Sequence, residues 1–492
     1  MVRLSRCLGT LGRIWIFLLP ALLTLIGQAA AQPTTIRVYP DSVLSDVSRH
    51  PLGINLDYFM DDDKYLHPQR RLADALKAMH VKYLRYPGGN KSDFYFFSRP
   101  PYAQAAPVLA RTGKDAVGGR NRALNAAATG FKNDVLDFDE FMLLCREVGA
   151  EPVIVVAADE YLVDYPAGST WASRKQLLDH AVEWVRYANI KHKYGVKYWM
   201  IGNETWGPEN KNSTAEIYAR DVVDFSTAMK AVDPGIQIIP NGNTEQWWKT
   251  VLTKAAGHID ALCLSNYPVY KLPNGFASYR DSVLNFMQPV AVAKQALARY
   301  ATPADRAKLK IIVAEYGPFD WGSKKWPFVN TMSYALANFE LTGEQLKEPA
   351  VAFSCFWNTR WIENDSVPHS VFDALDRQGN FNANGYSLQI WGQLLGQQMV
   401  QTTSSTHLRS FASYTPDKKS LLVYLVNKSA VAVPVTLQLG QYRVRATRQA
   451  WSLTSTGPDD TAPRWQQEKV LPSGTNLSVS ATSIRVIEYR LH

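Results

Sequence analysis

The sequence predicts an α/β protein made of a (β/α)8 TIM barrel over residues 49–400 and a C-terminal all-β sandwich over residues 401–492. Eight short runs rich in apolar and β-branched residues recur in the first region, and nearly all are followed by a helical pattern. From about residue 401, strand-like runs alternate with turn residues and no helical stretch interrupts them. A doubly wound sheet is the alternative for the first region, but polar groups at so many strand ends favour a closed barrel.

The expected elements alternate along the barrel region. The strands are expected at 51–56, 81–86, 152–157, 197–201, 236–239, 261–264, 311–314 and 351–356, and the helices at 72–79, 138–148, 173–194, 215–232, 246–256, 290–300 and 332–341. In the sandwich, strands are expected at 421–426, 433–439, 441–450 and 483–490. Residues 32–48 contain an alternating strand that has no barrel partner, so we expect it to join the sandwich.

Residues 1–31 have the pattern of a secretory signal peptide. Three arginines precede an apolar run at 14–26, and three alanines before Gln32 provide a small-residue cleavage site. A membrane anchor is the alternative, but the run is shorter than the roughly 20 apolar residues that a span needs. We therefore expect a secreted protein, extracellular or periplasmic, with no membrane span after the signal is removed.

Charge and cysteine content argue against several other classes. The formal net charge of +9 falls to +6 when the signal peptide, with three arginines and no acidic residue, is removed. No basic run indicates nucleic-acid binding. Cys145, Cys263 and Cys355 remain, an odd number without the spacing of a disulfide framework or a zinc site. We expect no metal and no cofactor, and the oligomeric state stays open.

Two of the predicted barrel strands are followed by a glutamate. The run at 197–201 continues into Gly-Asn-Glu and ends at Glu204, and the β-branched run at 310–314 is followed by Glu315. Either glutamate alone could be an ordinary loop residue. Because the carboxyl ends of barrel strands meet at one face, however, the two carboxylates are expected to lie together. A carboxylate pair is the arrangement of a glycoside hydrolase, in which one donates a proton and the other attacks or activates water.

A long segment at 93–133, rich in Ala, Gly and Arg, follows the second strand. Connections of this length are usually functional or disordered. Because the segment begins beyond a strand's carboxyl end, we expect it to wall the substrate cleft, while its detailed role stays open.

Several motifs together resemble the retaining glycosidases of clan A, and most closely the α-L-arabinofuranosidases of glycoside hydrolase family 51. The resemblance runs from about residue 36 to the C-terminus. Its motifs are Leu84-Arg85-Tyr86-Pro87-Gly88-Gly89-Asn90, Phe138-Asp139-Glu140-Phe141, Gly149-Ala150-Glu151-Pro152, Tyr198-Trp199 with Gly202-Asn203-Glu204, Ala228-Met229-Lys230, Val232-Asp233-Pro234 and Ser483-Ile484-Arg485-Val486-Ile487-Glu488-Tyr489.

The resemblance implies catalytic roles for the matching residues. Glu204 would be the general acid/base and Glu315 the nucleophile. Arg85 would lie beside the nucleophile and keep it ionised, with a structural salt bridge as the alternative. Asn203 would bind the sugar hydroxyl next to the anomeric carbon, and Tyr267 would donate a hydrogen bond to the nucleophile.

Further positions are candidates for substrate contact. Asp57 and Asn90 match sugar-contacting positions of the family. For these two residues and for Tyr267, a turn or capping role is the alternative. Three tryptophans stand at or just beyond strand ends, where an indole ring can stack on a sugar: Trp206, Trp321 and Trp357.

The sequence also departs from the family pattern within the predicted substrate pocket. The family's sugar-binding glutamate becomes Asp57, and Ser265 replaces a histidine near the sixth strand. Two segments also differ from the family, Ala157-Ala158-Asp159-Glu160 after the third strand and Phe356-Trp357-Asn358 at the eighth. These changes leave the carboxylate pair intact, so they bear on sugar specificity more than on the reaction.

The sequence therefore predicts a secreted retaining glycoside hydrolase that acts on plant-type polysaccharide, with an α-L-arabinofuranoside as the first expectation. A clan A endo-glucanase or xylosidase is the alternative within enzymes. A non-catalytic carbohydrate-binding protein is the alternative from another class, but such proteins typically lose one carboxylate or its support. Sugar specificity and exo or endo action stay open.

Overall fold

The computed structural model describes residues 33–492 except 113–129, 132–133, 164–168, 208–211, 361–369, 416 and 418. The predicted signal peptide at 1–31 lies outside the described residues. In the part of the chain that is described, no helix combines the length and apolar character needed to cross a bilayer.

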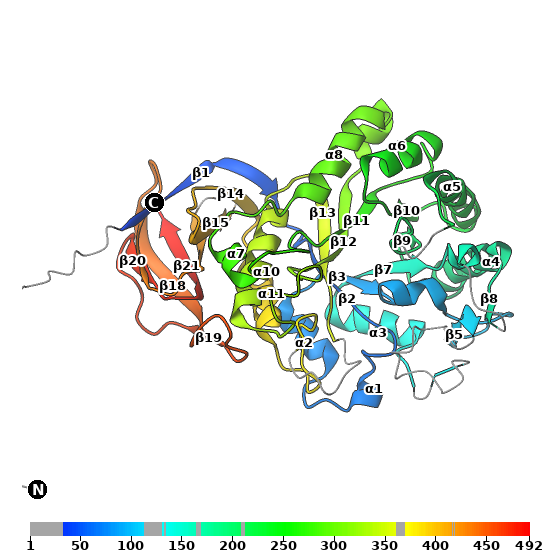
Figure 1. Cartoon of the computed structure of the whole chain (residues 1–492), viewed down its shortest axis with the longest axis horizontal. Coiled ribbons are helices and arrows are strands. Elements are labelled where there is room, and N and C mark those ends of the chain that lie inside the picture. Colours follow the sequence, from blue (N-terminus) through cyan, green and yellow to red (C-terminus); the bar gives the residue numbers. More distant parts are fainter. Residues whose placement is uncertain are drawn as a thin grey trace, which may run out of the picture. The chain divides into compact units, whose positions relative to one another are not determined.

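Eight parallel strands form the barrel (Figure 1). Their order in the sheet is β10-β9-β7-β3-β2-β13-β12-β11. A parallel bridge between Asn241 and Cys263 joins the two edge strands, which brings the sheet round into a barrel. The predicted fold class is confirmed. The strands are β2 (Leu52–Asn55), β3 (Tyr83–Tyr86), β7 (Glu151–Val156), β9 (Tyr198–Ile201), β10 (Gln237–Pro240), β11 (Leu262–Asn266), β12 (Ile311–Tyr316) and β13 (Val351–Phe356).

A helix follows each barrel strand, and Figure 1 shows α4, α5, α6 and α8 outside strands β7, β9, β10 and β11. The seven expected helices are confirmed to within a few residues, except that α4, the helix after β7, ends early and continues as a π-helical turn, η3 (Arg186–Lys191). The helices are α2 (Leu72–Met79), α3 (Phe138–Val148), α4 (Arg174–Val185), α5 (Ala215–Val232), α6 (Glu245–Lys254), α8 (Gln288–Tyr300), α10 (Met332–Leu346) and α11 (Ala383–Leu394).

The last of these helices, α11, was not predicted from the sequence. It is buried on nearly all sides, so it lacks the one-sided apolar pattern that identifies a surface helix. It also contains Gly385 and Gly392, and glycine has a low intrinsic helix propensity. Tertiary packing therefore stabilises a helix that local sequence disfavours.

Shorter helices and strands lie in the connections between the barrel strands and helices. They are α1 (Asp63–Leu66), η1 (Asn90–Phe94), β4 (Tyr95–Phe96), β5 (Val108–Leu109), β6 (Arg111–Thr112), η2 (Glu160–Leu162), β8 (Thr170–Trp171), α7 (Phe276–Arg280) and α9 (Pro303–Lys308).

The remaining strands form a nine-stranded sheet system that begins with the first described strand, β1 (Thr34–Asp46). The first four residues of β1 pair with β17 in parallel, and the rest pairs with β14 in antiparallel fashion, so β1 belongs to both faces of the sandwich. Strands β14, β15, β19 and β20 were not predicted. The other strands are β14 (Gln398–Thr402), β15 (Leu408–Tyr414), β16 (Ser420–Asn427), β17 (Val433–Gln438), β18 (Val444–Thr454), β19 (Arg464–Gln467), β20 (Asn476–Val479) and β21 (Ser483–Leu491).

Alternation along the barrel strands decides which side chains enter the barrel. In β3, Leu84 and Tyr86 pack outward against the helices, so Tyr83 and Arg85 point inward. In β2, Leu52 and Ile54 face outward in the same way, which leaves Gly53 and Asn55 inside. The lower layers are packed with apolar side chains: Val153, Val155, Met200, Ile239, Cys263, Ile312, Ala314, Phe353 and Cys355. The polar residues Asn55 and Arg85 therefore lie above this packing, towards the carboxyl ends of the strands.

A substitution at Gly392 can test how tightly α11 packs on α2. A Cβ atom at Gly392 would run into the backbone carbonyl of Met79, whereas a Cβ at Gly457 would meet no atom within 4 Å. We expect Gly392→Ala to destabilise the fold by about 1–3 kcal/mol, because overpacking outweighs the gain of about 1 kcal/mol in helix propensity. Gly457→Ala is the control and should be close to neutral. Urea denaturation of both variants measures the difference, and a stable Gly392→Ala variant would contradict the packing described.

Candidate active site

Both predicted catalytic glutamates line one pocket of about 580 Å³. Glu204 follows β9 and Glu315 lies near the end of β12, so the pocket opens at the carboxyl ends of the barrel strands. The remaining lining residues lie at the carboxyl ends of strands or in the segments that follow them: Asn90, Lys91, Trp206, Asn243, Ser265, Tyr267, Tyr270, Gln288, Pro289, Trp321 and Trp357.

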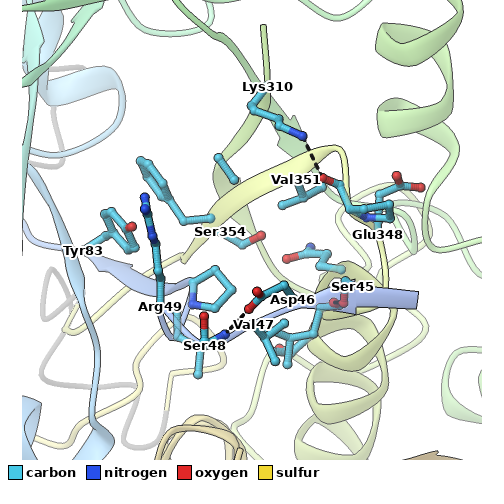
Figure 2. Close-up of a pocket in the computed structure, with 18 of the residues that line it drawn as sticks. Ser45, Asp46, Val47, Ser48, Arg49, Tyr83, Lys310, Glu348, Val351 and Ser354 are labelled. Atoms are coloured by element: carbon cyan, nitrogen blue, oxygen red, sulfur yellow. Dashed lines mark hydrogen bonds between the residues drawn. The ribbon is translucent and has the colours of Figure 1, made fainter. Parts of the chain in front are cut away.

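A second cavity, of about 480 Å³, lies at the other end of the strands. Figure 2 shows its lining, which includes Tyr83 and Val351, the first residues of β3 and β13, and Arg49 from the segment before β2. None of the predicted site residues borders it. Because catalytic groups of barrel enzymes lie at the carboxyl ends of the strands, the pocket with the two glutamates is the candidate active site.

The carboxylate of Glu315 is held by two donors. Its Oε1 accepts a hydrogen bond from Nη1 of Arg85 at 2.9 Å, and its Oε2 accepts one from the Tyr267 hydroxyl at 2.7 Å. Glu315 and Arg85 are only 5% and 2% exposed. The guanidinium and the carboxylate thus form a buried ion pair. Burial and the neighbouring Glu315 charge raise the pKa of Tyr267 well above its usual value, so its hydroxyl remains a donor.

The Arg85 guanidinium also organises the segment before Glu204. Its Nη2 donates to Oδ1 of Asn203 at 2.6 Å, and Nδ2 of Asn203 donates to Oδ1 of Asn90 at 3.0 Å. Glu204 itself is half-buried and has a positive φ of 44°. The next residue is fixed as well, because the Thr205 backbone N–H donates to Oδ1 of Asn241 at 3.0 Å.

Aromatic rings form much of the pocket wall. The rings of Tyr267 and Trp321 meet edge to face with centroids 4.6 Å apart, and Trp321 stacks on Phe372 at 5.6 Å. Trp206 and Trp321 are half-buried, whereas Trp357 is only 4% exposed. All three predicted tryptophans border the pocket, and an indole face there can stack on the C–H face of a sugar.

Three residues predicted to bind substrate do not border the pocket: Asp57, Arg85 and Asn203. Each is buried and contacts a residue that does border it. Asp57 lies 3.3 Å from Nζ of Lys91, while Arg85 contacts Glu315 and Asn203 contacts Asn90. The structure thus places Lys91 at the pocket where the sequence pointed to Asp57, and direct sugar contact by Asp57, Arg85 and Asn203 stays a prediction.

Sequence reasoning missed several residues of this site. Asn243 and Tyr270 lie in loops, Lys91 in the short helix η1, and Gln288 at the first position of α8, where no periodic pattern indicates orientation. Asn55 is different, because it ends an apolar strand, and its Oδ1 accepts a hydrogen bond from Nη1 of Arg85 at 2.7 Å. A polar amide within an apolar run was a signal that could have been used.

Only part of the 93–133 segment, which we expect to wall the substrate cleft, belongs to the described residues. Residues 113–129 and 132–133 lie outside the described residues. The described stretch 93–112 contributes nothing to the lining of the glutamate pocket, but it borders a separate cavity of about 420 Å³ together with Trp171 and Gln176.

Comparison with known proteins finds similarity to alpha-L-arabinofuranosidases. Residues 75–285 match the family model described as alpha-L-arabinofuranosidase 1 domain. A probable alpha-L-arabinofuranosidase C from Aspergillus terreus is 26% identical over 307 residues, which cover 55% of this chain and 55% of that protein. The matches cover between 32% and 55% of the length of these curated relatives.

Solved structures agree at the level of the fold. An alpha-L-arabinofuranosidase from Thermotoga maritima, solved as an arabinose complex, aligns over 93% of this chain and 99% of its own with a TM-score of 0.68 and 20% identity. By sequence and by fold, the chain resembles the family 51 arabinofuranosidases of clan A. A bifunctional glucanase-xylanase from a metagenome library also aligns, over 94% of this chain and 99% of its own, with a TM-score of 0.61 and 13% identity.

The departures from the family 51 pattern fall into two places. Ser265 and Trp357 border the pocket itself. Asp159 and Glu160 are buried instead, and they lie close to Asp93, whose Oδ1 accepts a hydrogen bond from the Asn203 backbone N–H at 3.2 Å. Burial raises the pKa of Asp93 well above its usual value, and the charges of Asp159 and Glu160 add to this effect.

The ionisation of Asp159 should make the free energy of unfolding depend on pH. Burial, followed by the charge of Glu160, raises the pKa of Asp159 to about 7. An aspartate in the unfolded chain ionises near pH 4, so between about pH 4 and pH 7 the unfolded state loses a proton that the folded state keeps. This difference lowers the free energy of unfolding as the pH rises, by an amount on the order of a few kcal/mol.

We therefore expect Asp159→Asn to lose less stability than the wild type between pH 4.5 and pH 8. Urea denaturation at both pH values measures this difference. Asp179→Asn is the control, because the Asp179 side chain is 49% exposed. Parallel loss of stability in the wild type and Asp159→Asn would mean that Asp159 ionises normally in the folded protein.

Proposed function

We propose that this protein is a secreted retaining glycoside hydrolase that releases α-L-arabinofuranosyl groups from plant-type polysaccharide. One observation carries the proposal: Glu315 is held by Arg85 and Tyr267 in a pocket that it shares with Glu204. A carboxylate oriented by a cation, in one pocket with a second, half-buried carboxylate, is what a double displacement requires. Similarity to the family 51 arabinofuranosidases supports the choice of sugar.

In the first step, Glu315 attacks the anomeric carbon and forms a glycosyl-enzyme. Glu204 donates a proton to the departing oxygen, which leaves as an alcohol. Arg85 and Tyr267 each hold one oxygen of the Glu315 carboxylate, so both of its oxygens have a fixed position. This arrangement keeps the attacking carboxylate ionised and aimed before the substrate arrives.

In the second step, water replaces the leaving group. Glu204, now ionised, takes a proton from that water as it attacks the anomeric carbon, and Glu315 departs as a carboxylate. Arg85 stabilises the negative charge that returns to Glu315. Two inversions at one carbon leave its configuration unchanged.

An endo-glucanase or a xylosidase of clan A is the second candidate. Tyr270 at the pocket is 57% exposed, where it could contact a further sugar unit. Hydrolysis of nitrophenyl glycosides beside arabinan, xylan and β-glucan decides between the two candidates.

Glu315→Gln should abolish this hydrolysis. We expect a loss of at least about 10³-fold in kcat/KM on the best substrate, because a neutral amide cannot displace the leaving group. Glu340→Gln is the matched control: Glu340 is 1% exposed and is likewise held by an arginine and a tyrosine, Arg409 at 2.6 Å and Tyr279 at 3.0 Å. It lies outside the pocket, so it should affect stability and leave the chemistry intact. A folded Glu315→Gln variant with normal turnover would rule out the proposed nucleophile.

Glu204→Gln should show a different signature. A nitrophenolate needs little protonation to leave, so this variant should lose less activity on nitrophenyl glycosides than on polysaccharide. Added azide should then speed its turnover, because azide attacks the glycosyl-enzyme without a general base. Glu315→Gln forms no such intermediate and should not respond. Product analysis would show a glycosyl azide, and the lack of azide rescue in Glu204→Gln would argue against an acid/base role.

Export rests on residues 1–31 and is proposed together with the activity. Expression in a secreting host should yield a mature chain that begins at Gln32. N-terminal sequencing measures this, and an intact Met1 on protein retained inside the cell would contradict it.

A further inference from the structure

Asn55 occupies a central position beneath the two carboxylates. It is the last residue of β2, its side chain points into the barrel, and it is 0% exposed. Leu56 and Ile54 on either side face the surrounding helices. An amide at such a position is costly to bury unless all its polar atoms find partners.

The Asn55 side chain is fully hydrogen-bonded. Its Nδ2 donates to the backbone carbonyls of Ala314 at 2.9 Å, Phe356 at 3.1 Å and, more weakly, Cys355 at 3.3 Å. Its Oδ1 accepts from Nη1 of Arg85 at 2.7 Å. Ala314 directly precedes Glu315, and Phe356 directly precedes Trp357, so this one amide ties together the strand ends that deliver two pocket residues.

These partners fix the orientation of the amide. Carbonyl oxygens only accept, so they must face Nδ2, and a guanidinium only donates, so it must face Oδ1. No flipped orientation satisfies both sides. Asparagine is the residue of this size that presents a donor to β12 and β13 and a neutral acceptor to Arg85.

The neutrality of this acceptor matters for Glu315. Nη1 of Arg85 contacts both Asn55 Oδ1 and Glu315 Oε1, and Nη2 contacts Asn203 Oδ1, which is also a neutral amide. Among the described residues, Glu315 is the one carboxylate paired with Arg85. The positive charge is therefore directed at a single anion.

We propose that Asn55 is a positioning residue of the reaction, which holds the Arg85 guanidinium against Glu315 without competing for its charge. The inference rests on the proposed function, since it assigns Asn55 a part in keeping the nucleophile ionised. It predicts an effect on the pH dependence of turnover that a packing role alone would not produce.

The surrounding groups make that pH dependence interpretable. Besides Glu315, the described titratable groups on which the Arg85 charge acts include Tyr267, Cys263 and Cys355. Burial raises the pKa of Cys263 and of Cys355 to about 12, and raises that of Tyr267 well above its usual value. These three side chains remain neutral below pH 8. The acid limb of kcat/KM therefore reports carboxyl groups: the two glutamates and, through Asn203, Asp93 and its neighbour Asp159, which no substitution at Asn55 alters.

The test is the pH profile of Asn55→Asp and Asn55→Ser. Asn55→Asp places a second carboxylate on Arg85, and Asn55→Ser removes the acceptor; both weaken the hold on ionised Glu315. We expect kcat/KM to fall about tenfold or more and its acid limb to move to higher pH by about one unit. Asn55→Asp preserves size and shape, and Asn55→Ser serves if that variant does not fold.

Asn427 provides a matched control in the sandwich. It is also 0% exposed, and its Nδ2 also donates to three backbone carbonyls, those of Val431, Val479 and Ser480. Asn427→Asp should lower the thermal stability and leave the acid limb in place. A shift of the limb in this control would mean that loss of stability alone moves the profile, and would overturn the assignment.

A double-mutant cycle with Arg85→Lys shows whether Asn55 acts through Arg85. A single ammonium cannot reproduce the fork of bonds to Asn55, Glu315 and Asn203, so the effect of Asn55→Ser on the acid limb should largely vanish in the Arg85→Lys background. Additive effects, or an unmoved acid limb in folded Asn55 variants, would overturn the inference. Absence of any glycosidase activity in the wild type would instead overturn the proposed function, so the two failures are distinct.

Discussion

The buried ion pair between Arg85 and Glu315 is the interaction on which the rest of the site depends. Removing both charges from water costs several kcal/mol per ion, and the cost is offset only where the remaining donors and acceptors are satisfied. Here the guanidinium contacts Glu315, Asn55, Asn203 and the sulfur of Met200, while Tyr267 holds the other carboxylate oxygen. One side of the Glu315 carboxylate still borders the pocket. The pair is thus stabilised by partners inside the barrel, and Glu315 is accessible to a substrate from the pocket.

The barrel brings these residues together from distant parts of the chain. Asn55, Arg85, Asn203, Tyr267 and Glu315 lie at or just beyond the carboxyl ends of five strands: β2, β3, β9, β11 and β12. The two-residue period of a strand sends Asn55 and Arg85 inward above a layer of apolar side chains. Since that layer excludes water, the hydrogen bonds above it act in a low-dielectric setting, where a fixed charge has its strongest effect.

The sequence predicted the barrel well because its signals are periodic and local. The eight strands and seven of the eight major barrel helices could be located from apolar spacing alone, and α11 escaped because burial on all sides removes that spacing. The two glutamates could be predicted because both end an apolar run. Lys91, Tyr270 and Gln288 could not, since residues in loops, short helices and helix ends reach the pocket through tertiary packing. Lys91 borders the pocket, whereas the sequence pointed to Asp57. This difference could not be predicted either, because it depends on a three-dimensional contact, the ion pair between the two residues at 3.3 Å.

Covalent labelling of the nucleophile tests the central claim most directly. An activated 2-fluoro arabinofuranoside should form the glycosyl-enzyme faster than water releases it, because the fluorine destabilises the positively charged transition state of both steps and the good leaving group compensates only in the first. Digestion and mass spectrometry should then find one sugar attached to the peptide that contains Glu315. If the unlabelled enzyme turns over its natural substrate but the label is found on Glu204 or on another residue, the assignment of Glu315 as the nucleophile held by Arg85 is contradicted.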